Sequence, residues 1–311
     1  MKKLILIIAS VMMISLIIAS FFYQNHNNTL SMPRYVELEK QIAQHEQAQE
    51  PEQTLYAQHT IDYSLQNDQL NITFDKGKNW INVPIDKDKL FAGDYNGSEQ
   101  ELIEDSYVLT KNRVAFLYSE GENWEHQKII ITYSLDQGKT WQDSVVTDPY
   151  PSIRFRKVDF LDDDFGYAII SGDRTMSQEG SSVFLTHDGG KDWEKANGPD
   201  TTRLLADGGF IDQKTGFLSY GTINPEAPDL YVTQNAGDSW EKATFHMPKK
   251  YDVVFVSAEV PVKEGNHLVV LVNQGPNGDY LGGEVKGKFI SDDHGRTWDF
   301  EKEVEPNETD E

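Results

Sequence analysis

Polar and apolar positions of this chain alternate in short runs and do not follow a helical period. Beyond residue 57, β-branched, aromatic and other apolar residues gather in short stretches, and turn residues such as Gly, Asp and Asn bound each stretch. No helical period is sustained between residues 58 and 305. The pattern therefore predicts an all-β body. Its clearest strands are residues 128–134, 166–172, 182–188, 216–222, 230–235 and 267–274.

One octapeptide recurs five times in this body. Each copy has a hydroxyl residue first, Asp or Asn third, Gly fifth and Trp eighth. The third positions of successive copies are 61, 52, 47 and 58 residues apart. Periods of about 40–50 residues that hold several strands each are typical of β-propeller blades. The copies are "TFDKGKNW" (73–80), "SLDQGKTW" (134–141), "THDGGKDW" (186–193), "TQNAGDSW" (233–240) and "SDDHGRTW" (291–298).

A second frame precedes two of these copies and divides the repeat into four strands. "FLDDDFGY" (160–167) and "FIDQKTGF" (210–217) share Phe, an aliphatic residue, Asp and a Gly-aromatic pair at the same spacing. We expect the first strand to end at this Phe-aliphatic-Asp, the second to begin at the Gly, the third to run into the octapeptide and the fourth to begin at its Trp. In the best repeat these strands are residues 155–161, 166–171, 182–187 and 193–196.

The repeats predict a propeller of five blades. The first blade is assembled from residues 58–84 and lacks a clear leading strand. This leaves two other arrangements open, a sixth irregular blade and closure of the ring by terminal strands.

The residue types of the octapeptide predict a hairpin turn and not a chemical site. Short Ser, Thr and Asp oxygens can bond the N–H groups of their own turn, and Gly adopts the positive φ that other residues resist. The Trp ring is expected to fill space between sheets. Because Asn235 keeps the acceptor but not the charge, a structural role is favoured. The structural residues are Asp75, Trp80, Asp136, Trp141, Asp188, Trp193, Asn235, Trp240, Asp293 and Trp298.

The five octapeptides resemble the Asp-box, or bacterial neuraminidase repeat, with the pattern Ser/Thr-x-Asp-x-Gly-x-Thr-Trp. This resemblance implies a propeller in which the box occupies the turn between the third and fourth strands of a blade, away from the ligand-binding face. When the second frame is considered with the boxes, residues 58–305 resemble the photosystem II assembly-factor type of Asp-box propeller. This type also occurs as exported proteins of non-photosynthetic bacteria. The resemblance specifies a fold and leaves the partner open.

The N-terminus predicts a membrane anchor. Residues 4–22 are uncharged and mostly apolar, which is long enough to cross a bilayer, and Lys2 and Lys3 favour a cytoplasmic start. The alternative is a cleaved signal peptide, which would make the protein secreted, but the apolar run is longer than such peptides need. We expect a cytoplasmic stub (1–3), a transmembrane signal anchor (4–22), a polar stalk (23–57), the extracytoplasmic propeller (58–305) and an acidic tail (306–311).

Charge and cysteine content exclude several functions. The formal net charge is −23, and the part beyond Phe22 carries −25 because every acid follows that residue. Nucleic-acid binding would therefore act against the field of the protein. The absence of cysteine excludes disulfides, thiolate metal sites and a cysteine nucleophile. No cofactor and no metal site are predicted.

Candidate binding residues lie in the loops expected at the face opposite the boxes. Sites on propellers usually use such a face, because every blade contributes a loop to it. The three arginines come from neighbouring repeats of an otherwise acidic domain, and Trp124 is the only tryptophan outside a box. The candidates are Arg154, Arg174, Arg203, Trp124, Tyr150 and Tyr280.

Two functions follow from these residues. No hydrolase, phosphate-binding or metalloprotease motif is present, so no catalytic residue is predicted and a non-enzymatic binding or assembly module for a protein or polymer partner is favoured. The alternative is a sialidase-like or other glycoside hydrolase, because sialidases hold the substrate carboxylate with three arginines. The Arg-Ile-Pro sequence of that family is absent near the first strand. Whether the protein is an enzyme stays open at this stage.

Overall fold

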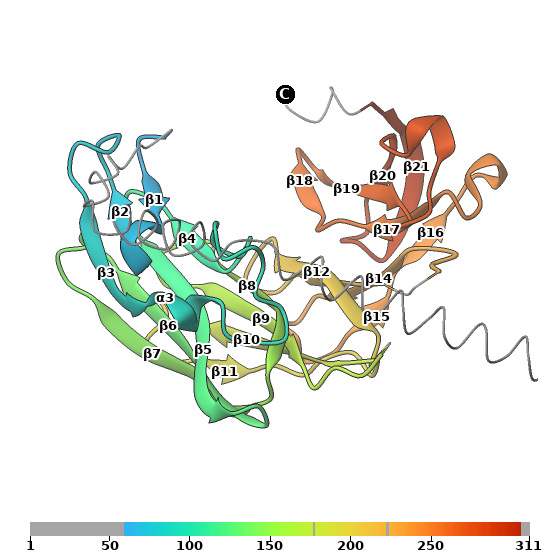
Figure 1. The fold of residues 1–311 in the computed structure, drawn as a ribbon. Coiled ribbons are helices and arrows are strands. Elements are labelled where there is room, and N and C mark those ends of the chain that lie inside the picture. Colours follow the sequence, from blue (N-terminus) through green and yellow to red (C-terminus); the bar gives the residue numbers. More distant parts are fainter. Residues whose placement is uncertain (1–58, 177, 222–223, 306–311) are drawn as a thin grey trace, which may run out of the picture. The chain divides into compact units, whose positions relative to one another are not determined.

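The computed structural model describes residues 59–176, 178–221 and 224–305, all within one compact unit of residues 55–311 (Figure 1). The predicted cytoplasmic stub, anchor, stalk and acidic tail lie outside the described residues. Within the described part of the chain, no helix has the length and apolar character needed to cross a membrane.

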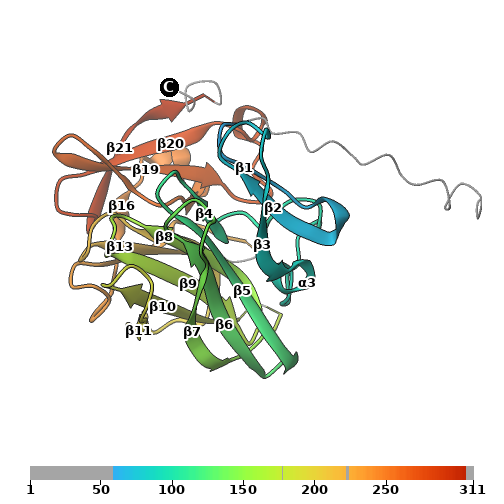
Figure 2. The same cartoon turned by 90° about the vertical axis from the view of Figure 1, so that its left-hand side faces the viewer.

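Five β-sheets follow one another along the chain, and nearly every described element is a strand (Figures 1 and 2). The second sheet contains β4 (Tyr107–Leu109), β5 (Val114–Asn123), β6 (His126–Ser134) and β7 (Gln142–Tyr150). The third contains β8 (Ile153–Phe160), β9 (Gly166–Gly172), β10 (Gly180–Thr186) and β11 (Glu194–Lys195). The fourth contains β12 (Leu204–Phe210), β13 (Gly216–Gly221), β14 (Asp229–Thr233) and β15 (Glu241–Lys242).

The third and fourth sheets confirm the division of the repeat into four strands. In both, the first strand ends at the Phe of the second frame, and the second strand begins at its Gly. Each box lies between the third and fourth strands of its sheet. The fourth strands, β11 and β15, begin one residue after the Trp and are only two residues long.

The first and fifth sheets depart from the four-strand pattern. The first has three strands, β1 (Asp62–Ser64), β2 (Gln69–Thr73) and β3 (Ile81–Asp86), in agreement with the expected lack of a leading strand. In the fifth, β17 (Phe255–Ala258) and β18 (Val262–Glu264) both pair with β19 (His267–Gln274), followed by β20 (Lys286–Ser291) and β21 (Thr297–Val304). Outside β21 lies β16 (Thr244–His246), which pairs with it in parallel.

Helical turns are confined to the connections. They are η1 (Gln66–Asp68), α3 (Lys87–Leu90), η2 (Lys249–Tyr251) and η3 (Tyr280–Gly282). Residues 244–251 thus include a strand and a 3-10 turn. Phe245 of this strand packs on Trp298 and Phe289, which explains why this short segment is held against the fifth sheet.

The core consists of four apolar clusters, each between successive sheets. Alternate residues of the central strands serve different clusters: Ala168 and Ile170 of β9 face the second sheet, and Tyr167 and Ile169 face the fourth. All seven residues of β9 are buried. Sheets that are stacked through both faces in this way are the blades of a β-propeller. The number of blades that closes the ring stays a prediction.

All five boxes form the same hydrogen-bonded turn. In the second box, Ser134 Oγ donates to Asp136 Oδ1 (2.9 Å) and accepts from the Gly138 N–H (2.8 Å), while Asp136 accepts from the Thr140 N–H (2.9 Å). Equivalent bonds occur in the other four, with Asn235 Oδ1 replacing a carboxylate oxygen in the fourth. The predicted hairpin turn, held by short side-chain oxygens, is therefore confirmed.

The boxes also join neighbouring sheets. The guanidinium of Arg113, in the turn before β5, donates to the carbonyls of Gly189 in the third box (2.8 Å) and Asp163 (2.8 Å) and stacks over Phe160. In the fifth box, Gly295 has a φ of +89°, and a Cβ there would lie 2.4 Å from Phe217 of the fourth sheet. Both the backbone conformation and the close packing thus require glycine at this position.

Hydrogen bonds within the boxes should make stability depend on acidic pH. Bonds from Thr140 lower the pKa of Asp136 to about 2, and the pKa values of Asp75, Asp188 and Asp293 are also lowered. A lowered pKa in the folded state stabilises the fold above the unfolded value of 3.8, and this stabilisation is lost as pH falls through the folded value. We therefore expect the melting temperature to fall between about pH 4 and pH 2.

Replacing the four box aspartates by asparagine is the control for this prediction. Asn235 shows that the turn forms with an amide. The variant Asp75→Asn, Asp136→Asn, Asp188→Asn, Asp293→Asn should therefore show a flatter dependence of melting temperature on pH in the same interval. An unchanged dependence would mean that other carboxylates cause the loss of stability in acid.

Candidate functional site

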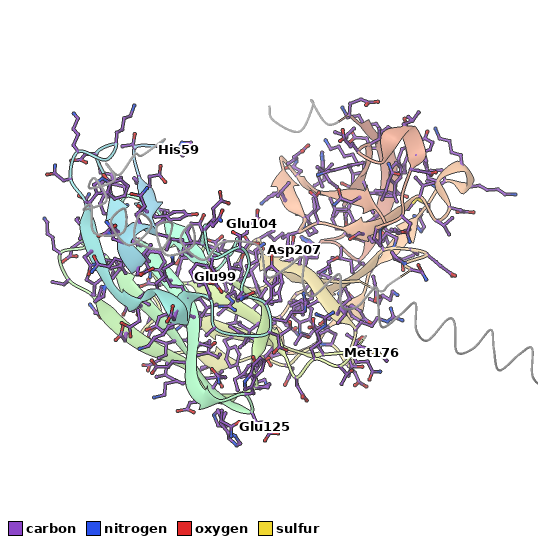
Figure 3. The ribbon with its side chains drawn as sticks, in the orientation of Figure 1. His59, Glu99, Glu104, Glu125, Met176 and Asp207 are labelled. Carbon is purple, nitrogen blue, oxygen red and sulfur yellow. The ribbon has the colours of Figure 1, made fainter. Side chains whose placement is uncertain are left out.

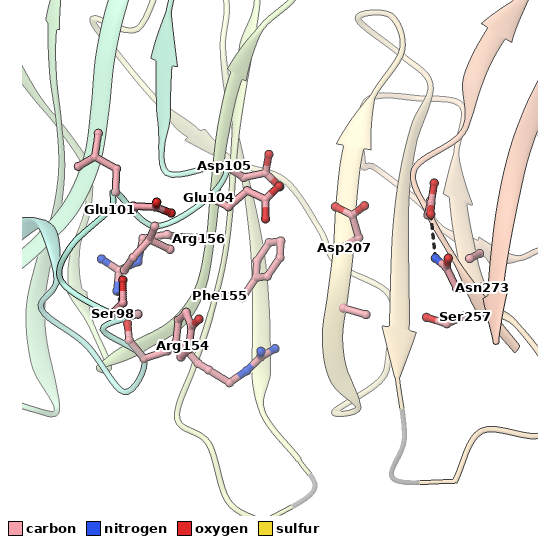
Figure 4. Close-up of a pocket in the computed structure, with 17 residues that line it drawn as sticks. Ser98, Glu101, Glu104, Asp105, Arg154, Phe155, Arg156, Asp207, Ser257 and Asn273 are labelled. Carbon is pink, nitrogen blue, oxygen red and sulfur yellow. Dashed lines mark hydrogen bonds between the residues drawn. The ribbon is translucent and has the colours of Figure 1, made fainter. Parts of the chain in front are cut away.

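A cavity with a volume of about 680 Å³ lies along the first strands of several sheets. Its walls combine residues 95–105, which precede β4, with residues 154–156 of β8, 206–207 of β12, and 257–259 at the end of β17. Figure 4 shows Glu104 and Asp105 on one side of the cavity and Asp207, Ser257 and Asn273 on the other. Residues far apart in the sequence therefore form one site.

Irregular strand pairing accompanies this cavity. The register of β8 against β9 shifts between Ile153 and Phe155, and the register of β12 against β13 shifts between Leu205 and Asp207. β17 has a similar shift between Phe255 and Ser257. Bulges of this kind bend a strand and change the direction of its side chains. They place Arg154, Ala206 and Ser257 in or beside the cavity wall.

The cavity wall is predominantly acidic. Its lining side chains include two arginines and five carboxylates, which are Glu101, Glu104, Asp105, Asp207 and Glu259. Glu101 and Glu104 are exposed, and no Lys or Arg of the described residues lies within ion-pair distance of either. Glu259 accepts hydrogen bonds from Lys286 (2.6 Å) and Asn273 (2.8 Å).

Lys157 links two of these carboxylates from different sheets. Its Nζ lies 3.1 Å from Asp105 Oδ2 and 2.9 Å from Asp207 Oδ1. Burial alone would lower the pKa of this ammonium, but Asp207 and Asp105 outweigh burial, so its pKa is raised. Lys157 therefore remains charged and holds the two carboxylates together.

Arg156 fixes one wall of the cavity. Its side chain is buried, and the guanidinium donates to the carbonyls of Leu90 (3.1 Å), Ala92 (2.7 Å) and Tyr95 (3.1 Å). Burial lowers its pKa to about 10, so it stays protonated at neutral pH. Gly93, with a φ of +133°, permits this close approach, because a Cβ there would lie 2.3 Å from the Ile153 carbonyl. The segment before β4 is thus attached to β8.

The structure does not bring the three predicted arginines together. Arg154 lines the cavity, but its guanidinium pairs with the fully buried carboxylate of Glu179 and donates to the Leu205 carbonyl. Arg203 pairs with Asp229, and Arg174 is exposed in the loop after β9. Neither Arg174 nor Arg203 lines the cavity. The arrangement therefore lacks the cluster that a triad for a substrate carboxylate requires.

The predicted aromatic residues occupy three different environments. Trp124 is 67% exposed between β5 and β6. Tyr150 is buried, its hydroxyl donates to the Ile170 carbonyl (3.4 Å), and burial raises its pKa to about 12. The Tyr280 hydroxyl donates to Glu303 (2.9 Å). None of these three residues lines the cavity, and their role in binding stays a prediction. Figure 3 shows Glu125, the neighbour of Trp124, and Met176 away from Glu104 and Asp207.

Apart from Arg154, the cavity residues were not identified as candidates from the sequence, although one signal was present. Lys157 and Asp207 each stand three residues before the Phe of the second frame, and Asp207 is the only charged residue of its strand. A charged residue at the same position of two inner strands indicates that this position reaches solvent. Glu101, Glu104 and Asp105 precede a short strand and gave no comparable signal.

Comparison with known proteins identifies the repeats. The family described as BNR/Asp-box repeat matches residues 132–143 and 289–300, which contain the second and fifth boxes. No curated protein sequence matches the chain.

Several solved structures are similar to the fold at low sequence identity. A protein of unknown function from Dyadobacter fermentans is 14% identical, with 62% of this chain and 66% of that chain covered and a TM-score of 0.41. The GH74 xyloglucanase from Xanthomonas campestris is 14% identical, with 75% and 34% covered and a TM-score of 0.40. Trypanosoma rangeli sialidase is 12% identical, with 68% and 41% covered and a TM-score of 0.42.

These TM-scores are too low to support an argument about activity, and the chain spans well under half of the xyloglucanase and the sialidase. The family match and the shared geometry of the five turns nevertheless agree. The chain carries BNR/Asp-box repeats in an all-β, propeller-type body.

Proposed function

We propose that this protein is a non-enzymatic binding or assembly module, held on the outer side of the membrane by residues 4–22, whose partner binds at the acidic cavity. The pairing of charged groups inside the cavity supports this proposal most directly. Asp105 and Asp207 share the ammonium of Lys157, and Arg154 is paired with Glu179. These groups hold sheets together, while the exposed Glu101, Glu104 and Tyr95 are free to contact a partner.

A glycoside hydrolase is the second candidate, because carboxylates from different sheets face one cavity (Figure 4). Such enzymes need one carboxyl group with a raised pKa as the acid and a second carboxylate opposite it. Asp159 has a pKa raised by burial, but it does not line the cavity. Asp105 and Asp207 both contact the Lys157 ammonium, so they belong to an ion-paired bridge between elements of the fold. The binding function is therefore preferred.

Site-specific photo-crosslinking in cells tests this preference. A photoreactive residue at Tyr95, which is 54% exposed at the cavity, should crosslink a discrete partner. The same residue at Leu135 is the matched control, because it is 49% exposed but lies in the second box. Crosslinks from Leu135 alone would place the partner at the boxes and contradict the proposal.

Turnover of glycans decides between the two candidates. The purified full-length chain should not hydrolyse a panel of sialosides and plant or bacterial glycans. If it does, and if Asp105→Asn with Asp207→Asn abolishes the turnover while the fold is retained, the hydrolase replaces the binding module.

A further inference from the structure

We infer that the cavity binds a positively charged side chain of its partner, so that the partner is a polypeptide with a lysine- or arginine-rich segment. This inference rests on the proposed binding function. It names the chemical class of the partner and the residues that recognise it.

The first support is an ammonium group that is already bound there. Lys157 places its Nζ between Asp105 and Asp207, which come from the segment before β4 and from β12. The structure thus contains one example of the interaction that the inference requires. It shows that carboxylates from two separate segments of the chain converge closely enough to share one organic cation.

The second support is that the cationic groups of the cavity are already occupied. These groups are two arginines: Arg154 is bound by Glu179, and Arg156 by three backbone carbonyls. An anionic ligand would have to displace these contacts and would meet five carboxylates. A cationic ligand meets Glu101 and Glu104, which form no ion pair within the described residues.

The third support is aromatic surface beside the carboxylates. Tyr95 is 54% exposed, and Phe155 is half-buried in the same wall. Cations bind favourably over aromatic rings, and the methylene groups of Lys and Arg pack on apolar surface while their charge remains solvated. A basic side chain therefore fits both the carboxylates and the rings. The charge of −25 beyond Phe22 would also attract such a segment from a distance.

A direct binding measurement tests the inference. Full-length protein in nanodiscs of uncharged lipid is titrated with fluorescently labelled deca-lysine, and the dissociation constant is determined by anisotropy. The double variant Glu101→Gln, Glu104→Gln should bind about tenfold more weakly. The double variant Asp192→Asn, Glu194→Gln removes the same charge from exposed positions near the third box and should bind like wild type. Equal weakening in both variants would show attraction to net charge alone and overturn the inference.

Lys157→Gln provides a second measurement with the opposite expected sign. It frees Asp105 and Asp207 from their internal cation, so deca-lysine should bind at least about threefold more tightly. Weaker binding by this variant, with its fold retained, would contradict the inference that Asp105 and Asp207 belong to the cation-binding site.

A chitosan oligomer of equal charge distinguishes a polypeptide from an amino-sugar partner. Binding of chitosan but not deca-lysine would overturn the polypeptide assignment. If Tyr95 crosslinks a partner while neither cationic probe binds, the binding function stands and the inference on charge fails.

Discussion

Replacing Arg154 by methionine is expected to lower the free energy of unfolding by about 3–5 kcal/mol, because it leaves a buried carboxylate without its counter-charge. The Glu179 side chain is fully buried, and both of its oxygens accept hydrogen bonds from Arg154. Glu179 Oε1 also accepts the Leu205 N–H (2.6 Å), so this pair connects β8, the start of β10 and β12. Urea unfolding followed by tryptophan fluorescence measures the change.

Two further variants separate this effect from a general loss of surface charge. Arg154→Met combined with Glu179→Gln should be much less destabilised than Arg154→Met alone, since the amide is neutral and keeps an acceptor for Leu205. Arg203→Met is the matched control. Its partner Asp229 retains Lys242 at 2.7 Å, and Arg203 is half exposed, so a loss of about 1 kcal/mol or less is expected. Equal losses for Arg154→Met and Arg203→Met would contradict the prediction.

Replacing Trp298 by alanine should cost about 3–5 kcal/mol, as expected for truncation of a fully buried aromatic side chain. Trp298 is completely buried, stacks on Phe245 at 6.0 Å between centroids, and contacts Phe217 of the fourth sheet at 6.4 Å. Its indole N–H donates to the Gly295 carbonyl (3.0 Å). Chemical denaturation gives the free energy directly.

The same substitution at Trp193 is the control. The sequence predicted that the box Trp fills space between sheets, and Trp193 does so while only partly buried, with Phe160 at 6.1 Å between ring centroids. Trp193→Ala should therefore cost clearly less than Trp298→Ala. Equal losses in the free energy of unfolding would mean that the packing around Trp298 does not increase the cost of its truncation.

Local sequence signals predicted the repeated architecture well, because each signal acts within one hairpin. A hydroxyl, a carboxylate and a glycine at fixed spacing determine the box turn, and the Gly of the second frame marks the beginning of β9 and β13. These interactions join residues at most four apart in the sequence. They can therefore be inferred without knowledge of the three-dimensional arrangement.

The candidate site was less predictable because long-range pairing decides which charges remain available. Arg154 was expected in a loop and suggested a binding residue, yet it lies in β8 and is paired with Glu179, 25 residues later. Lys157 donates to Asp207, which lies 50 residues later in the sequence. The cavity also depends on register shifts in β8, β12 and β17, and no residue type specified them.

The parallel pairing of β16 with β21 has a consequence for biosynthesis. Residues 244–246 leave the ribosome about 50 residues before their partners at 297–299. Their hydrogen bonds with β21, and the stacking of Phe245 on Trp298, can therefore form only after β21 has been synthesised. The earlier sheets contain only strands that are close in sequence and can pair as they emerge. The parallel pair, by contrast, requires β21, and a chain truncated before β21 would expose an unpaired edge to cellular quality control.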